Sequence, residues 1–233
     1  MRKGALLLMA GLAIATLTAA PAMAARPDQS AAMPDLGLAP NTPWADAPLA
    51  ILYTQYDNSG TSLISSQNFE AAYDIYDDFA ADDFVVPANT SWKITGVGVQ
   101  GGYFDVGQGP VDSFNVLVYT DGGGIPGVLR VTKSNMTYTL NGTDQFRIKV
   151  SPAITVPASP SPRHLWIAVQ ANMDANPKGQ WGWTTRTVQS NDPAAWENPG
   201  GGFLICPNWG DLATCIGITD PDFVYLLFGT STP

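Results

Sequence analysis

The chain has 233 residues, 20 of them Asp or Glu and 11 Lys or Arg, so its formal net charge at pH 7 is −9. An acidic surface repels the phosphates of nucleic acids and anionic lipid head groups, which excludes both as expected partners. The only glutamates are Glu70 and Glu197, and with 23 Gly and 19 Pro this composition predicts strands joined by many turns.

The first 24 residues have the three parts of a secretion signal. Arg2 and Lys3 give a positive start, residues 4–20 carry no charge, and an Ala-Met-Ala cleavage site ends at Ala24. A membrane anchor is the alternative and needs about 18 or more apolar residues, but Pro21 and the small residues around it favour a peptidase site. We predict cleavage near Ala24, a secreted or periplasmic mature chain, and no membrane span.

Residues 25–48 are rich in Ala, Pro and Asp, a composition typical of a disordered arm, and the folded domain is expected over residues 49–233. Within it, short runs of β-branched and aromatic residues recur between Gly, Pro, Asn or Asp. Ten strands are predicted, at residues 50–55, 77–86, 92–100, 113–120, 128–133, 136–140, 145–150, 165–171, 180–186 and 223–228. One short helix fits at residues 68–75. The pattern predicts an all-β fold, an antiparallel β-sandwich.

Two of these runs are expected in the middle of a sheet. Residues 113–120 and 165–171 carry apolar side chains at both odd and even positions, so both faces of each strand should be covered. The Gly-rich run 121–127 predicts a sharp turn, and Asn141-Gly142 between alternating runs predicts a hairpin.

The first candidate site is acidic. Asp77, Asp78, Asp82 and Asp83 lie within a short stretch, and carboxylates are the hard oxygen ligands that Ca²⁺ prefers, so a structural Ca²⁺ is one interpretation. The alternative is that these acids are turn and edge residues that keep the sheet from pairing with a neighbour. Alternation puts Asp78 and Asp82 on one side of the strand and Asp77 and Asp83 on the other, so one pair at most should serve one ion.

The second candidate site is aromatic. Trp181 and Trp183 share one face of a predicted strand, and Trp196 and Trp209 lie in Gly-rich segments. Exposed aromatic rings can stack on sugars, while packing in the core is the competing use. We expect the segment from Trp196 to Trp209 to carry any stacking, because the Pro and Gly residues after Glu197 cannot cover a ring.

Cys206 and Cys215 are the only cysteines. In an exported chain their pairing is the default, and a loop this short gains on the order of 2.5–3 kcal/mol from closure. A metal or redox pair would need a CxxC spacing or a neighbouring His, and the sequence has neither.

Several motifs together resemble a secreted bacterial β-sandwich module that recurs in surface and extracellular proteins. They are residues 79–87 (FAADDFVVP), 92–97 (WKITGV), 114–119 (FNVLVY), 124–127 (GIPG), 166–173 (WIAVQANM), 179–183 (GQWGW) and 195–203 (AWENPGGGF). This resemblance implies a jelly-roll-like sandwich at a cell surface or in secreted material. It carries no catalytic residues over to this chain.

Catalysis has little support in the sequence. His164 is the only histidine, it adjoins a predicted core strand, and neither G-x-S-x-G nor H-E-x-x-H occurs. We therefore expect a non-catalytic extracellular binding module for carbohydrate or a surface or matrix component. The alternatives are a structural or adhesive surface protein without a small ligand, and a glycoside hydrolase that uses two carboxylates.

Overall fold

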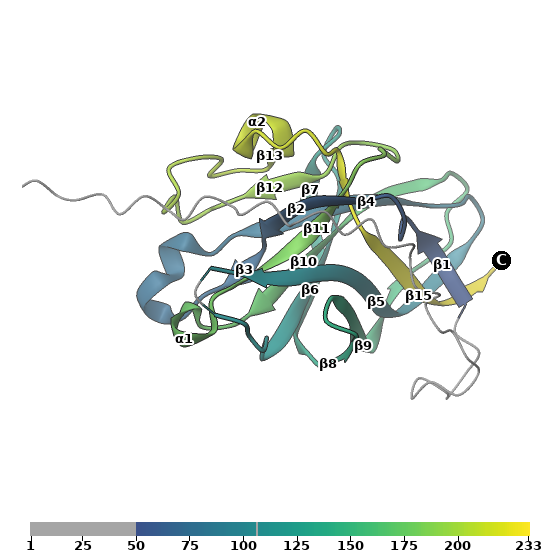
Figure 1. Ribbon diagram of the computed structural model, residues 1–233. Coiled ribbons are helices and arrows are strands. Elements are labelled where there is room, and N and C mark those ends of the chain that lie inside the picture. The colour runs from purple at the N-terminus through teal and green to yellow at the C-terminus, as the bar shows by residue number, and fades with distance from the viewer. Residues whose placement is uncertain (1–49, 106) are drawn as a thin grey trace, which may run out of the picture.

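Two β-sheets pack against each other in the computed structural model, which describes residues 50–105 and 107–233 (Figure 1). The eight-stranded sheet runs β1 (Ala50–Thr54), β15 (Tyr225–Thr232), β5 (Ser91–Phe104), β11 (Gln180–Arg186) and β14 (Asp222–Phe223), with β2 (Ser59–Ser65) paired to β11 and β9 (Gln145–Val156) paired to β5 and β8 (Tyr138–Asn141). The seven-stranded sheet runs β13 (Gly210–Asp211), β12 (Ala195–Glu197), β4 (Phe79–Val86), β10 (Arg163–Asn172), β6 (Ser113–Asp121) and β7 (Pro126–Met136), with β3 (Gln67–Asn68) beside β10. The predicted signal and arm, residues 1–24 and 25–48, lie outside the described residues.

The pairings confirm the predicted fold class, an antiparallel β-sandwich. Among the described strands, only the short pairing of β3 with β10 is parallel. Over residues 50–105 and 107–233, helical structure is limited to a 3-10 helix, η1 (Ala71–Tyr76), and the short α1 (Ala175–Lys178) and α2 (Leu212–Ile216). η1 overlaps the one stretch where the sequence predicts a short helix, whereas α1 and α2 were not predicted.

The main core lies between the two sheets and follows the alternation of the strands. In β6, Phe114, Val116 and Val118 point into it, and β10 contributes Leu165 and Ile167. The opposite faces of β6 and β10 are buried as well, in a second cluster that contains Leu117, Tyr119, Trp166 and Ala168. Both strands are therefore covered on each side, as the sequence predicts.

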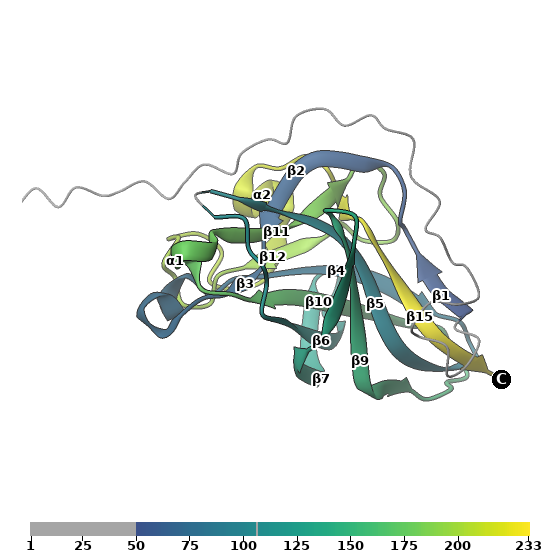
Figure 2. The same cartoon turned by 60° about the horizontal axis from the view of Figure 1, so that its bottom comes forward.

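Two tight turns form where the sequence predicts them. The turn between β6 and β7 contains Gly123 and Gly124 with φ angles of 93° and 86°, a region of backbone conformation that glycine occupies without strain. β8 and β9 form the predicted antiparallel hairpin, with Gly142 at φ 66°. Figure 2 shows that the last described strand, β15, lies between β1 and β5.

Cys206 and Cys215 form the predicted disulfide, with their Cα atoms 5.6 Å apart. The bond ties the loop after β12 to α2, and a disulfide-bonded pair fits a protein outside the cytoplasm. Across residues 50–105 and 107–233, the helices are too short or too polar to cross a membrane.

Candidate functional site

The two acids before β4 hold the connection that leads into this strand. Asp77 Oδ1 accepts a hydrogen bond from the Phe69 N–H at 2.8 Å, and Asp78 Oδ1 accepts one from the Gln67 N–H at 2.6 Å. Asp78 is fully buried, and burial raises its pKa to about 8. Both side chains are therefore engaged in the β3–β4 connection rather than gathered around an ion.

Asp82 and Asp83 are neighbours in β4, so their side chains point to opposite faces of the sheet. Asp82 lies between the sheets, where its Oδ2 accepts hydrogen bonds from Gln55 Nε2 and the Phe223 N–H, each at 2.6 Å. Asp83 faces outward. Of the four predicted ligands, it is the only one that belongs to a cluster of three or more metal-ligating side chains among the described residues. The four acids therefore do not share one site.

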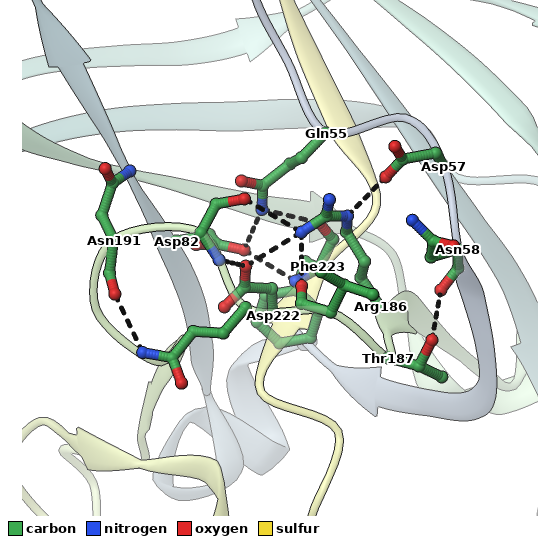
Figure 3. Close-up of polar contacts among 12 residues, drawn as sticks. Gln55, Asp57, Asn58, Asp82, Arg186, Thr187, Asn191, Asp222 and Phe223 are labelled. Carbon is green, nitrogen blue, oxygen red and sulfur yellow. Dashed lines mark hydrogen bonds and ion pairs between the residues drawn. The ribbon is translucent and has the colours of Figure 1, made fainter.

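A charged network is buried where β11, β14 and the segment after β1 meet (Figure 3). The Arg186 side chain is only 7% exposed, with Nε 2.6 Å from Asp57 Oδ1 and Nη1 3.3 Å from Asp222 Oδ2. Asp222 Oδ2 also accepts a hydrogen bond from the Ser190 N–H at 2.6 Å. Figure 3 shows Asp82 and Asp222 on the same side of the network, next to the Arg186 guanidinium.

One guanidinium does not balance both buried carboxyl groups of this network. Burial raises the pKa of Asp222 to about 7, against the opposing effects of the Ser190 N–H and the Arg186 charge. Burial, and then the nearby Asp222 carboxylate, hold the pKa of Asp82 well above its ordinary value. Both effects favour the neutral form of Asp82, and its carboxyl group is engaged in hydrogen bonds with Gln55 and the Phe223 N–H in the core.

A different set of ligand side chains meets on the outer face of the seven-stranded sheet. Asp83 on β4, His164 on β10 and Asp192 in the loop between β11 and β12 bring their ligand atoms within 4.8 Å of one another. His164 Nε2 contacts Asp83 Oδ2, and its Nδ1 lies 3.7 Å from Asp192 Oδ2. The exposed fractions of the His164 and Asp192 side chains are 27% and 39%, whereas Asp83 has none.

Strand register and loop hydrogen bonds hold this cluster together. Trp166 pairs with Asp83 across β10 and β4, so His164 is the diagonal neighbour of Asp83 on the same face. The Asp192 N–H donates to Asp83 Oδ2 at 2.8 Å, and Asn191 Nδ2 donates to Asp83 Oδ1 at 3.2 Å. Burial raises the pKa of Asp83, and these hydrogen bonds and His164 oppose that shift.

Three of the four predicted aromatic ligand residues lie in the core. Trp181 and Trp183 have no exposed surface, and Trp196 is 1% exposed. The Trp183 indole N–H donates to the Val224 carbonyl at 3.0 Å, and that of Trp196 donates to the Ser65 carbonyl at 3.1 Å. A ring enclosed in this way has no face open to a sugar, so of the two uses that the sequence left open for these three residues, the structure shows core packing.

Trp209 is the one described tryptophan that is partly exposed. Its ring packs edge to face with Tyr119 and Phe79, at centroid distances of 5.6 and 6.5 Å. Beneath it, the outer face of the sheet has small side chains at Ala81 and Ala168, which leave room for a large ring. Trp209 therefore rests on the same outer face that carries the Asp83, His164 and Asp192 cluster.

Glu197 lies close to this aromatic group. It pairs with Phe79 across β12 and β4, and its charge acts on Tyr119. Burial raises the pKa of Glu197 to about 7. The outer face thus combines a partly exposed indole ring with a carboxyl group that donates or accepts hydrogen bonds near neutral pH.

The sequence signals missed most of this face. His164 stands out in the sequence only as the single histidine, beside a predicted core strand, and no motif marks Asp192, Tyr119 or Glu197 as site residues. The alternation of residues 165–171, extended back by one position, places His164 on the same face of the strand as Trp166. This alternation is the one sequence signal that points to His164 as a residue of the outer face. Comparisons with protein-family models, with curated proteins and with solved structures found no match.

Proposed function

We propose that this protein is a non-catalytic binding module, secreted or periplasmic, that takes carbohydrate on the outer face of its seven-stranded sheet. The observation that carries the proposal is Trp209, the one tryptophan within residues 50–105 and 107–233 that is not buried. A ring of this kind supplies a large apolar area for stacking. The proposal assigns no reaction to the protein.

Two features support Trp209 as a binding platform. Trp209 lies within the loop closed by the Cys206–Cys215 disulfide, and its ring is wedged against Tyr119 and Phe79. A side chain held in this way loses little freedom when a ligand docks, which favours binding. Glu197 beside it offers hydrogen bonding to a sugar hydroxyl.

The second candidate is a structural or adhesive surface protein without a small ligand. The burial of Trp181, Trp183 and Trp196 favours it, because these rings serve the core alone. Trp209 itself packs against the outer-face cluster that contains Ala81. Its ring could therefore serve to stabilise the fold instead of binding a ligand. The two candidates differ in what removal of the Trp209 ring does.

Replacing Trp209 with alanine should abolish or strongly weaken binding to the glycan that the parent protein selects on a glycan array. Trp209→Phe keeps an aromatic face and should retain part of the affinity. The melting temperature of Trp209→Ala should fall less than that of Trp196→Ala, since removing a fully buried Trp costs about 3–5 kcal/mol. Affinity would be measured by titration calorimetry with the selected glycan.

Two results would favour the second candidate, a structural or adhesive protein without a small ligand. One is a parent protein that binds no glycan on the array. The other is a Trp209→Ala variant that binds as the parent does, or that loses as much stability as Trp196→Ala.

A further inference from the structure

We propose that Asp83, His164 and Asp192 form a binding site for one divalent first-row transition metal ion, with Zn²⁺ as the representative. The site is separate from the proposed carbohydrate platform at Trp209, although both lie on the outer face of the seven-stranded sheet. It also differs from the calcium site that the sequence predicts, because it takes only Asp83 from that set.

The His164 ring directs Nε2 at Asp83 and Nδ1 at Asp192, and one imidazole binds one ion through one nitrogen. A shared ion therefore requires the Asp83 carboxylate to leave Nε2 and turn toward the ion held by Nδ1. Bonds from Zn²⁺ to imidazole nitrogen and carboxylate oxygen are about 2.0–2.2 Å long, which places two ligands of a tetrahedral ion about 3.4 Å apart. His164 Nδ1 and Asp192 Oδ2 are separated by 3.7 Å. Asp83 completes a group in which all three ligand atoms lie within 4.8 Å of one another.

The scaffold under the site is rigid. β4 is paired on both sides, by β12 and β10, and β10 is paired on both sides, by β4 and β6. The Asp83 carboxylate is further oriented by the Asn191 side chain and the Asp192 N–H, which are the supporting contacts that metal-ligating carboxylates usually have.

The local charge favours a cation. Asp83 is completely buried, and its one ion pair within the described residues is with His164, which is not permanently charged. Asp121, the last residue of β6, adds a third carboxylate whose charge interacts with His164. Its Oδ1 accepts a hydrogen bond at 3.2 Å from the indole N–H of Trp166, whose ring stacks on that of His164. Arg186, on β11, is paired with Asp57 and Asp222. A divalent ion would supply the missing positive charge.

The donor set selects the kind of ion. Imidazole nitrogen is a borderline ligand that suits zinc and its neighbours in the first transition row, whereas Ca²⁺ takes six to eight oxygen ligands. One imidazole nitrogen and two carboxylates therefore favour a first-row transition metal ion over Ca²⁺. The partial exposure of His164 and Asp192 leaves an entry path, and solvent would fill the remaining coordination positions.

Isothermal titration of the metal-stripped full chain with ZnCl₂ tests the site. The parent should bind one ion per chain, and zinc should raise its melting temperature, because the ion binds the native state alone. His164→Gln and Asp192→Asn should each lower zinc affinity at least tenfold and reduce the thermal shift. Asp174→Asn is the matched control: Asp174 is exposed, its side chain makes no cap hydrogen bond to α1, and its removal should leave both readouts unchanged.

The melting temperatures of the metal-free variants establish that each one folds. Absence of zinc binding by the parent would overturn the proposal, as would full zinc affinity in His164→Gln or Asp192→Asn. A site that prefers CaCl₂ to ZnCl₂ and is unaffected by His164→Gln would overturn the assignment of imidazole as a ligand.

Discussion

Replacing Arg186 with methionine should lower the free energy of unfolding by about 3–5 kcal/mol at pH 8, the range for removing one partner of a buried ion pair. The Arg186 side chain is 7% exposed and contacts Asp222, which is completely buried. Methionine fills much of the volume of the arginine side chain but leaves the Asp222 carboxylate without its cation. Urea unfolding followed by tryptophan fluorescence measures the change.

Two variants separate the buried part of this network from the exposed part. Asp57→Asn removes the other ion-pair partner of Arg186. Because the Asp57 side chain is 55% exposed, the free energy of unfolding should fall by about 1 kcal/mol or less. Adding Asp222→Asn to Arg186→Met should recover part of the stability, because the unpaired charge is gone. Equal losses in Arg186→Met and Asp57→Asn would contradict the importance of burial here.

The protein should be more stable at about pH 5 than at about pH 8, because its buried carboxyl groups favour the protonated form. The pKa of Asp78 is raised to about 8 and that of Asp222 to about 7, in each case first by burial. Between the ordinary pKa of Asp, about 3.9, and these folded values, the native state holds protons that the unfolded chain releases. Stability should therefore fall as pH rises through this window, by up to about 1.4 kcal/mol per pH unit for each proton.

Asp78→Asn provides the matched control for this pH dependence. Asparagine keeps an oxygen that accepts the hydrogen bond from the Gln67 N–H but cannot ionise. Urea unfolding at a series of pH values should give a shallower slope for the variant than for the parent. A parent whose stability rises over this window would contradict the prediction, and so would a variant with the same slope as the parent.

The strands that sequence patterns predicted well are those with two-sided burial. β6 and β10 are apolar at both odd and even positions because each is covered on both faces. β2 was missed because its sequence, SGTSLIS, mixes Gly and Ser with two apolar residues and offers no clear alternation. β12 and β13 have only three and two residues and lie among Gly and Pro, where local patterns predict loops.

Side-chain positions depended on contacts between distant segments, which local sequence does not encode. The glycines after Trp196 left both exposure and core packing open for its ring, and the cover that decides between them comes from Ser65 and from the partly buried Phe203. Those glycines serve another purpose: a Cβ on Gly202 would lie 2.6 Å from the Ile75 carbonyl oxygen. The outer-face cluster likewise needs β4, β10 and a loop in register before Asp83, His164 and Asp192 meet.

The position of β15 between β1 and β5 bears on how the chain folds. β15 is the one described partner of β1, and Ala50 pairs with Gly229 across almost the whole described length. Pairings between residues so far apart in sequence give the sheet a high contact order. The entropy of closing the long loop must be overcome before these pairings stabilise the fold, so folding should be slow. Until β15 docks, β1 and one edge of β5 remain open to pairing with other chains, which makes this late step the point most exposed to aggregation.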